Sequence, residues 1–390
     1  MSGKKRGYQG ASCVCTGCQG DARFVSRRSR SVVCLFGGIR VTRPYYHCAL
    51  CHAGESPWDQ ELGLTNRLLT PAVAELATLA GTMESFARAA DVNLRKMTGL
   101  RLSESTVERT TEDAGRRLGE LLGQRIKFGE DRVWDWQRDA QGRTCAYASL
   151  DATGVRRQGE NGARMEGRMA YVASIYNPQS KHDERPRDAH QVRYLAGFYD
   201  LDELGVQFRR QAGQVGWDEA EQQIALSDGG SGMEQFLRRN FPLAEIIIDF
   251  WHAKEYLVEL AQATFNHEEQ RQQWIDKMCH ELKHEGGSAV HSQLEAMERE
   301  VIPSAKELHR QTVGYFANHK HKMNYPKYVA NGWQIGSGPI ESACRTIVGD
   351  RLKGSGMRWG DDGADAVCHI RALSRSEPDQ WDEFWRRHRN

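Results

Sequence analysis

Three acidic residues stand where a folded chain could use them as metal ligands. Asp151 follows the strand-like run in SLDATG, Asp228 follows the run in LSDGGSG, and Glu341 lies in the first turn of an amphipathic helix that begins after GSGP. Sites of α/β sheets form beyond the carboxyl ends of the strands, and Mg²⁺ prefers carboxylate ligands. The two aspartates predict a site for a hard cation, and Glu341 is the third acid that a site for two ions needs.

Each acid taken alone has an ordinary alternative. Asp-Gly is common turn chemistry, so Asp228 could merely form a turn, and Asp151 likewise. Glu341 could do no more than complement the dipole of its helix. A fourth acid, Asp249, ends the apolar run in AEIIIDFWH and could cap the helix that follows it.

Four cysteines form two pairs with the spacing of metal-binding knuckles, Cys15-x-x-Cys18 and Cys48-x-x-Cys51. The runs SVVCLF and IRVTRPYY between them are strand-like, and Gly37-Gly38 is a two-residue hairpin signal. A hairpin would bring the two pairs together, and four thiolates make a closed tetrahedral zinc site. The alternative is four buried thiols without a metal, and Cys13 could compete with Cys15 as a ligand.

Charge is balanced over the 390 residues, with 53 basic and 52 acidic side chains, but not locally. Residues 1–45 hold nine basic residues and one acidic residue, among strand-forming residues, which favours a nucleic-acid surface over a solvated tail. The candidate contacts in this segment are Arg27, Arg28, Arg30, Arg40 and Arg43.

The sequence shows neither a signal peptide nor an apolar run of about 18 residues that could cross a membrane. We therefore expect a cytoplasmic protein without a membrane partner. In that compartment the 10 cysteines should be reduced or bound to metal.

Hydrophobic periodicity divides the chain into successive regions. We expect a basic zinc-ribbon-like domain (1–66), a helix-turn-helix-like DNA-binding domain (67–130), the first part of an α/β core (131–252), a helical insertion (253–330) and the end of the core with an acidic helix and a C-terminal tail (331–390). In the second region, Thr70 and Pro71 mark a helix start, and an ordinary helical bundle is the alternative to a helix-turn-helix. The core has the order strand, strand, strand, helix, strand, helix, strand.

Several long motifs are similar to those of one family. SLDATGV, SDGGSGMEQFLRRNFP, IIIDFWHAKEYL and above all IGSGPIESACRTIVGDRLKGSGMRW resemble mutator-like DDE transposases of bacterial insertion sequences, specifically the ISKra type. The resemblance covers most of the chain and includes the N-terminal cysteine knuckles. The chain departs from the commoner family pattern in the residues after the acids, DATG and DGGSG, but neither change removes a carboxylate.

The resemblance implies an α/β fold with an RNase H-like catalytic core and a helical insertion before the acidic helix. It implies that Asp151, Asp228 and Glu341 are catalytic and hold two Mg²⁺ ions, for which Mn²⁺ can substitute. The implied reaction is DNA strand cleavage and strand transfer, a phosphoryl transfer at the inverted repeats of an insertion sequence and at target DNA. A homodimer on double-stranded DNA is the expected assembly.

Further roles follow from the same resemblance. Asp249 and His252 match an Asp-x-x-His motif, which implies that they orient a metal ligand or position DNA; a helix cap and a structural histidine remain the alternatives. In an RNase H-like sheet, the strands that bear Asp228 and Asp249 would be parallel neighbours. Basic residues after Glu341 are further candidates for phosphate contacts: Arg345, Arg351, Lys353 and Arg358.

Two other functions are compatible with these residues. One is a domesticated DNA-binding regulator that has kept the fold and lost the chemistry, against which the presence of all three acids argues. The other is an RNase H-like nuclease that cuts DNA without joining it.

Overall fold

The computed structural model describes residues 7–64, 68–160, 163, 165–178, 191–230, 232–336 and 338–389, with only the backbone of 299–300 and 388–389. Contacts divide the chain into two compact units. Unit 1 comprises Met1–Glu120 and Pro378–Asn390, and unit 2 comprises Leu121–Glu377. The C-terminal helix thus belongs with the N-terminal unit rather than with the end of the core, where the sequence had led us to assign it.

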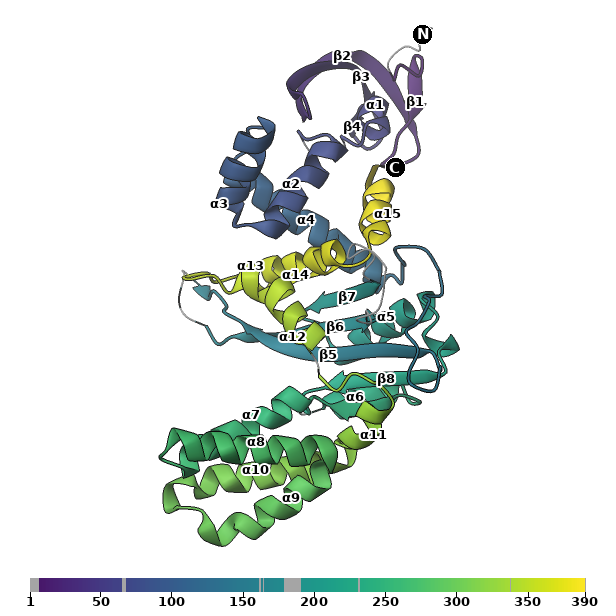
Figure 1. The fold of residues 1–390 in the computed structure, drawn as a ribbon. Helices are drawn as coiled ribbons and strands as arrows, with labels where there is room; N and C mark the ends of the chain where they lie inside the picture. Colours follow the sequence, from purple (N-terminus) through teal and green to yellow (C-terminus); the bar gives the residue numbers. More distant parts are fainter. Residues whose placement is uncertain are drawn as a thin grey trace. The chain divides into compact units, whose positions relative to one another are not determined.

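A four-stranded antiparallel sheet opens unit 1. Its order is β1 (Ser12–Val14), β2 (Asp21–Cys34), β3 (Gly37–Cys48) and β4 (Gly54–Glu55). Strands β2 and β3 form the long hairpin that the sequence predicts (Figure 1). The predicted turn is wrong, because the two turn residues are Leu35 and Phe36 rather than Gly37-Gly38. Gly37 pairs with Cys34 at the first position of β3 and has a φ of 101°, the conformation that glycine tolerates directly after such a turn.

Helices complete unit 1. They are α1 (Pro57–Glu61), α2 (Pro71–Met83), α3 (Phe86–Arg88), which continues as a π-helix (Ala89–Lys96), α4 (Glu104–Gly123, entering unit 2 at its end) and α15 (Pro378–Arg389). Helix α2 begins at Pro71 as predicted, although the Thr70 side chain makes no capping hydrogen bond. Helix α15 packs against α2, and Trp381 Nε1 donates to Glu75 Oε1 at 3.2 Å. The helical character of this region is confirmed.

A five-stranded mixed sheet forms the centre of unit 2. Its order is β7 (Val192–Gly197), β6 (Arg168–Tyr176), β5 (Cys145–Val155), β8 (Gln222–Ser227) and β9 (Glu245–Ile248). Strands β5, β6 and β7 are an antiparallel meander, whereas β8 and β9 run parallel to β5. The predicted order of elements and the predicted parallel pairing of β8 with β9 are both confirmed.

Alternation along the strands gives the sheet two buried faces. Ala146, Ala148 and Leu150 of β5 pack in one core with residues of α5 (Leu201–Gln214) and α6 (Met233–Asn240). Cys145 and Tyr147 point to the opposite face and join a second core with residues of the following helices. Both faces are therefore covered, as parallel strands require.

The helical insertion leaves the sheet after β9. It contains α7 (Phe250–Thr264), α8 (Glu268–His284), α9 (Gly287–Ala296), α10 (Lys306–His319) and α11 (Tyr325–Ala330), of which α8, α9 and α10 lie side by side in Figure 1. The chain returns where it left, because Phe250 N donates to the carbonyl of Ile335 at 2.9 Å. Then follow α12 (Gly338–Ala343), a π-helical turn (Cys344–Gly349), α13 (Asp350–Leu352) and α14 (Asp361–Arg375), which packs on β7.

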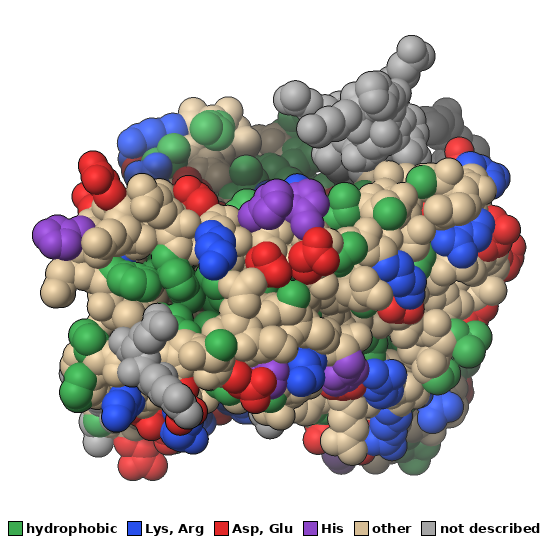
Figure 2. Space-filling view, turned by 60° about the horizontal axis from the view of Figure 1, so that its bottom comes forward, with side chains coloured by type: hydrophobic (Ala, Val, Ile, Leu, Met, Phe, Trp, Pro, Cys, Tyr) green, Lys and Arg blue, Asp and Glu red, His purple; other side chains and the backbone are tan. Residues whose placement is uncertain are grey.

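One face of the molecule is shown in Figure 2, and it is mixed in charge. Acidic and basic side chains are interspersed over the face that Figure 2 shows, without one dominant patch. None of the helices in the described residues combines the length and apolar character needed to span a membrane.

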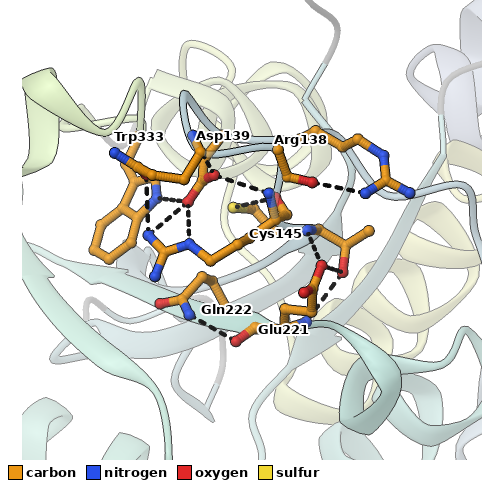
Figure 3. A network of polar contacts seen from close by, with 10 residues as sticks. Arg138, Asp139, Cys145, Glu221, Gln222 and Trp333 are labelled. Carbon is orange, nitrogen blue, oxygen red and sulfur yellow. Dashed lines mark hydrogen bonds and ion pairs between the residues drawn. The ribbon is translucent and has the colours of Figure 1, made fainter.

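A polar network holds the starting edge of β5 and β8 (Figure 3). Asp139 accepts hydrogen bonds from Arg143 Nε at 2.9 Å and from Trp333 Nε1 at 3.3 Å. Burial opposes ionisation of Asp139, but these hydrogen bonds hold its pKa below the ordinary value. Because Trp333 lies just after the insertion, the network fixes the returning chain where β5 and β8 begin. The candidate metal ligands lie toward the other ends of these two strands.

A buried ion pair gives a test of unit 2. Arg193 Nε lies 2.7 Å from Glu377 Oε2, with 1% and 7% of the two side chains exposed. Glu377→Gln should lower the free energy of unfolding by about 3–5 kcal/mol, because it leaves the Arg193 charge buried and uncompensated. Urea denaturation measures this.

The exposed pair of Arg239 and Asp202, with 70% and 73% exposure, is the matched control. Asp202→Asn should change stability by only about 0–1 kcal/mol. Equal effects of the two substitutions would contradict the assignment of Glu377 as a buried counter-ion.

Candidate active site and zinc site

The four knuckle cysteines meet at one point of unit 1. Their Sγ atoms all lie within 4.8 Å of one another, with 3.5 Å between Cys15 and Cys51 and between Cys18 and Cys48. A tetrahedral zinc ion with Zn–S bonds of about 2.3 Å separates its sulfurs by about 3.8 Å. The cluster therefore has the ligand type, number and spacing of a structural zinc site.

The backbone of the two knuckles supports this assignment. Gln19 and His52 each follow the second cysteine of a knuckle, and both have a positive φ, 62° and 59°. Hydrogen bonds from backbone N–H groups, foremost that of Cys51, lower the pKa of the Cys48 thiol to about 7, which favours the thiolate that binds metal. Cys13 lies outside the cluster and burial raises its pKa, so it does not replace Cys15.

Asp151 lies on β5, and Asp228 lies at the same level, directly after the end of the adjacent parallel strand β8. Ser149 and Leu226 are the last residues paired between β5 and β8. Asp151 stands two residues beyond Ser149, and Asp228 stands two residues beyond Leu226. Period-two alternation along β5 turns the Asp151 carboxylate to the face that carries Tyr147, and Asp228 is close enough for its charge to raise the pKa of Asp151. The two acids that the sequence predicts as ligands are thus brought together toward the carboxyl ends of β5 and β8.

The surroundings of Asp151 fit a carboxylate that needs a cation. Burial raises its pKa; hydrogen bonds from Cys344 Sγ to Oδ2 at 3.2 Å and from the backbone N of Ala152 oppose this, and the charge of Asp228 raises it further. A bound metal ion would relieve both the burial and the repulsion between the two acids.

The loop after Asp228 is held by its own backbone and by α10. Gly230 N donates to Asp228 Oδ1 at 2.7 Å, and the hydroxyl of Tyr315 donates to the Asp228 carbonyl at 3.1 Å. Gly229 has a φ of 86°, and a Cβ there would come within 3.1 Å of His319 Nε2. Burial, with the charge of Lys322, lowers the pKa of His319 to about 4, so a neutral imidazole faces this loop.

Glu341 lies on α12, which packs against β5 and β6. It is exposed and stands three residues before Cys344, so both side chains leave the same face of the helix. In the part of the chain that the structure describes, only the cysteine cluster joins three or more potential ligands at metal-binding distance. Glu341 is therefore on the facing element but is not joined with Asp151 and Asp228 at that distance.

Asp249 caps helix α7. Its Oδ1 accepts a hydrogen bond from Trp251 N at 2.8 Å, and the residue is fully buried. The cap that the sequence left open is present, and burial keeps this carboxylate from touching DNA directly. His252 is partly exposed, with Nδ1 at 3.2 Å from Glu255 Oε2, and it is close enough to lower the pKa of Asp151.

Substitutions separate the two residues of this motif. Asp249→Ala should lower the free energy of unfolding by about 0.5–2 kcal/mol through loss of the cap, whereas Asp249→Asn keeps a capping side chain. His252→Ala should leave the melting temperature nearly unchanged and reduce the DNA cleavage that the resemblance implies by about 10–100-fold, the loss typical when a group that supports a metal ligand is removed.

Melting temperature and cleavage rate measured on one DNA substrate decide between these roles. His280→Ala, an exposed histidine on α8, is the control. A lower melting temperature with unchanged cleavage in His252→Ala would make His252 a packing residue only.

The arginines proposed for DNA divide into accessible and occupied groups. Arg30 Nη1 and Arg43 Nε both bind Asp59, at 3.0 and 2.8 Å, and their side chains are only 18% and 14% exposed. Arg351 is 2% exposed and lies over the ring of Trp359. These three therefore hold the fold together, which corrects their assignment as DNA contacts. The exposed candidates are Arg27, Arg28, Arg40, Arg345, Lys353 and Arg358.

Some residues near the acids are not among those that the sequence predicts. Cys344 carries a signal, because it follows Glu341 by one helical turn on the apolar stripe. Tyr315 and His319 carry none, because they reach Asp228 from a helix far along the chain.

No protein-family model matches the chain, and no curated protein matches it.

Proposed function

We propose that this protein is a DDE transposase with an RNase H-like core, which cuts DNA at the ends of a bacterial insertion sequence and joins those ends to target DNA. The observation that carries the proposal is the pair of carboxylates at the same level, Asp151 on β5 and Asp228 directly after β8, with the π-helical turn after α12 touching Asp151 through Cys344. The sheet order, a three-stranded meander followed by two parallel strands, and the long motif around Glu341 support it.

Asp151, Asp228 and Glu341 would hold two Mg²⁺ ions, and such ions would supply activation of the attacking oxygen and stabilisation of the departing one. In cleavage, water oxygen bonds to phosphorus, the bond to the 3′ oxygen breaks, and that oxygen takes a proton to become a 3′-hydroxyl. In joining, the 3′-hydroxyl attacks a target phosphodiester and releases a new 3′-hydroxyl, so the number of phosphodiester bonds is conserved. No oxidant or nucleotide is consumed.

The residues of this chain have separate tasks in that reaction. Cys344 fixes the orientation of Asp151 by donating to Oδ2. Exposed basic side chains must hold the phosphates that the acids repel, and one candidate is Lys353, which donates to the hydroxyl of Thr153 two residues beyond Asp151. Binding of DNA should therefore weaken with salt.

The test uses purified protein, Mg²⁺ and duplexes carrying the DNA that flanks the gene. A transposase cuts at the ends and, given a donor end with a 3′-hydroxyl, inserts it into a plasmid. Cutting without joining would identify a nuclease, and binding without either reaction would identify a regulator. Calcium in place of Mg²⁺ serves as the control that permits binding without chemistry.

A further inference from the structure

The β2–β3 hairpin has one occupied face and one free face. Cross-strand pairs alternate between faces, so Arg28, Arg30 and Arg43 point one way, toward the Asp59 contact. The opposite face carries exposed side chains that are all basic or hydroxylic: Arg27, Ser29, Ser31, Arg40 and Thr42. Between Ser26 and Tyr45 the sequence contains no acidic residue, so nothing within the hairpin neutralises this face.

The tip of the hairpin is apolar and bare. Phe36 is 97% exposed and Leu35 is 51% exposed, while Ile39 two residues into β3 is 44% exposed. A turn in water is usually built from polar residues and glycine, because they satisfy the turn and tolerate solvent. The Phe36 ring is so exposed that it contributes almost no packing to unit 1.

The hairpin is anchored close to its tip. Val33 N donates to the Leu68 carbonyl at 2.6 Å, and Thr70 N donates to the Val33 carbonyl at 3.0 Å. Arg30 Nη1 adds a bond to the Leu64 carbonyl at 2.7 Å. The other end of the hairpin carries the cysteine cluster. The strand that leads to Phe36 is therefore held three residues before the ring, at Val33.

We propose that this hairpin is a DNA-bending arm, in which Arg27 and Arg40 contact phosphates and Phe36 inserts between base pairs from the minor groove. Apolar side chains flanked by basic ones act as wedges of this kind, since partial unstacking bends the duplex and brings more of it against the protein. The positive, acid-free face selects DNA rather than a protein surface as the occupant. The inference rests on the proposed function in that it takes duplex DNA as the partner.

Bending of a generic duplex of about 25 base pairs with a fluorophore at each end tests the proposal without any need for cleavage, since a duplex this short stays nearly straight unless protein bends it. Wild-type protein should raise energy transfer between the ends, and Phe36→Ala should abolish that rise while weakening binding only severalfold. Phe36→Trp should restore it. Arg27→Gln with Arg40→Gln should lower the salt slope of binding by about 2, because two phosphate contacts are lost.

Met97→Ala removes another exposed apolar side chain of unit 1, 76% exposed, and this variant should bend DNA as wild type does. Bending by Phe36→Ala equal to wild type would overturn the proposal. A Phe36→Ala variant that still bends DNA but sediments as a smaller species than wild type would also overturn it. That result would assign the hairpin tip to contact with a second copy of the chain. A protein that bends DNA through Phe36 but neither cuts nor joins it would leave the arm standing and remove the proposed function.

Discussion

Asp151→Asn, Asp228→Asn and Glu341→Gln should each abolish DNA cleavage while leaving DNA affinity within a few fold of wild type. An amide keeps the shape of the side chain but is a poorer ligand for Mg²⁺ than a carboxylate. Removal of a group that merely orients a metal ligand costs about 10–100-fold, so removal of the ligand itself should cost more than that. Single-turnover cleavage and a gel-shift titration on the same duplex measure the two quantities.

Asp350→Asn provides the matched control. This acid lies on α13, which follows the helix of Glu341 in the chain, and its side chain is 55% exposed. It should cleave at the wild-type rate. Near-normal Mg²⁺-dependent cleavage by any of the three variants would remove that acid from the ligand set. Glu341 is the most informative of them, because it is exposed on a separate helix and the three acids do not form one group at metal-binding distance in the described residues.

Cys48→Ser should release the one zinc ion expected per chain and unfold the sheet of unit 1. The described apolar core of that sheet is small, consisting of Cys13, Cys15, Ala22, Tyr46 and Cys48, with few partly buried neighbours. Structural zinc contributes on the order of 10 kcal/mol to the folding of such modules, which so small a core cannot replace. Elemental analysis gives the zinc content, and limited proteolysis reports the loss of structure.

Cys34→Ser is the control for zinc. Cys34 lies outside the cluster and donates to the Gly37 carbonyl, a bond that serine can also make. This variant should retain zinc and resist protease. Wild-type protein that is free of metal yet keeps a protease-resistant N-terminal unit would contradict the zinc assignment, and the thiols would then be unligated.

The sequence predicts best those features that local chemistry determines. The two cysteine knuckles, the start of α2 at Pro71 and the order of the strands all follow from spacing or periodicity, and the structure has them. The hairpin turn was misplaced because a glycine pair suggests a turn of its own, whereas here Gly37 supplies a positive φ directly after the turn.

The sequence alone does not predict which arginines form ion pairs in the fold. Arg30 and Arg43 read as free positive charges until the fold brings Asp59 to them from 29 and 16 residues away. Arg351 likewise read as a DNA contact, but it is buried beside Trp359. Counting charges cannot tell a paired arginine from an accessible one, because the difference depends on contacts between distant parts of the chain.

The contact between Asp151 and Cys344 joins residues that are 193 positions apart. At about 5–20 residues per second, a ribosome needs about 10–40 s to travel from one to the other. The β2–β3 hairpin, by contrast, is complete once Cys48 has emerged. A nascent chain should therefore acquire its candidate DNA-binding arm well before α12 can complete the carboxylate site. Under the proposed function, attachment to DNA during synthesis would precede the ability to cut it.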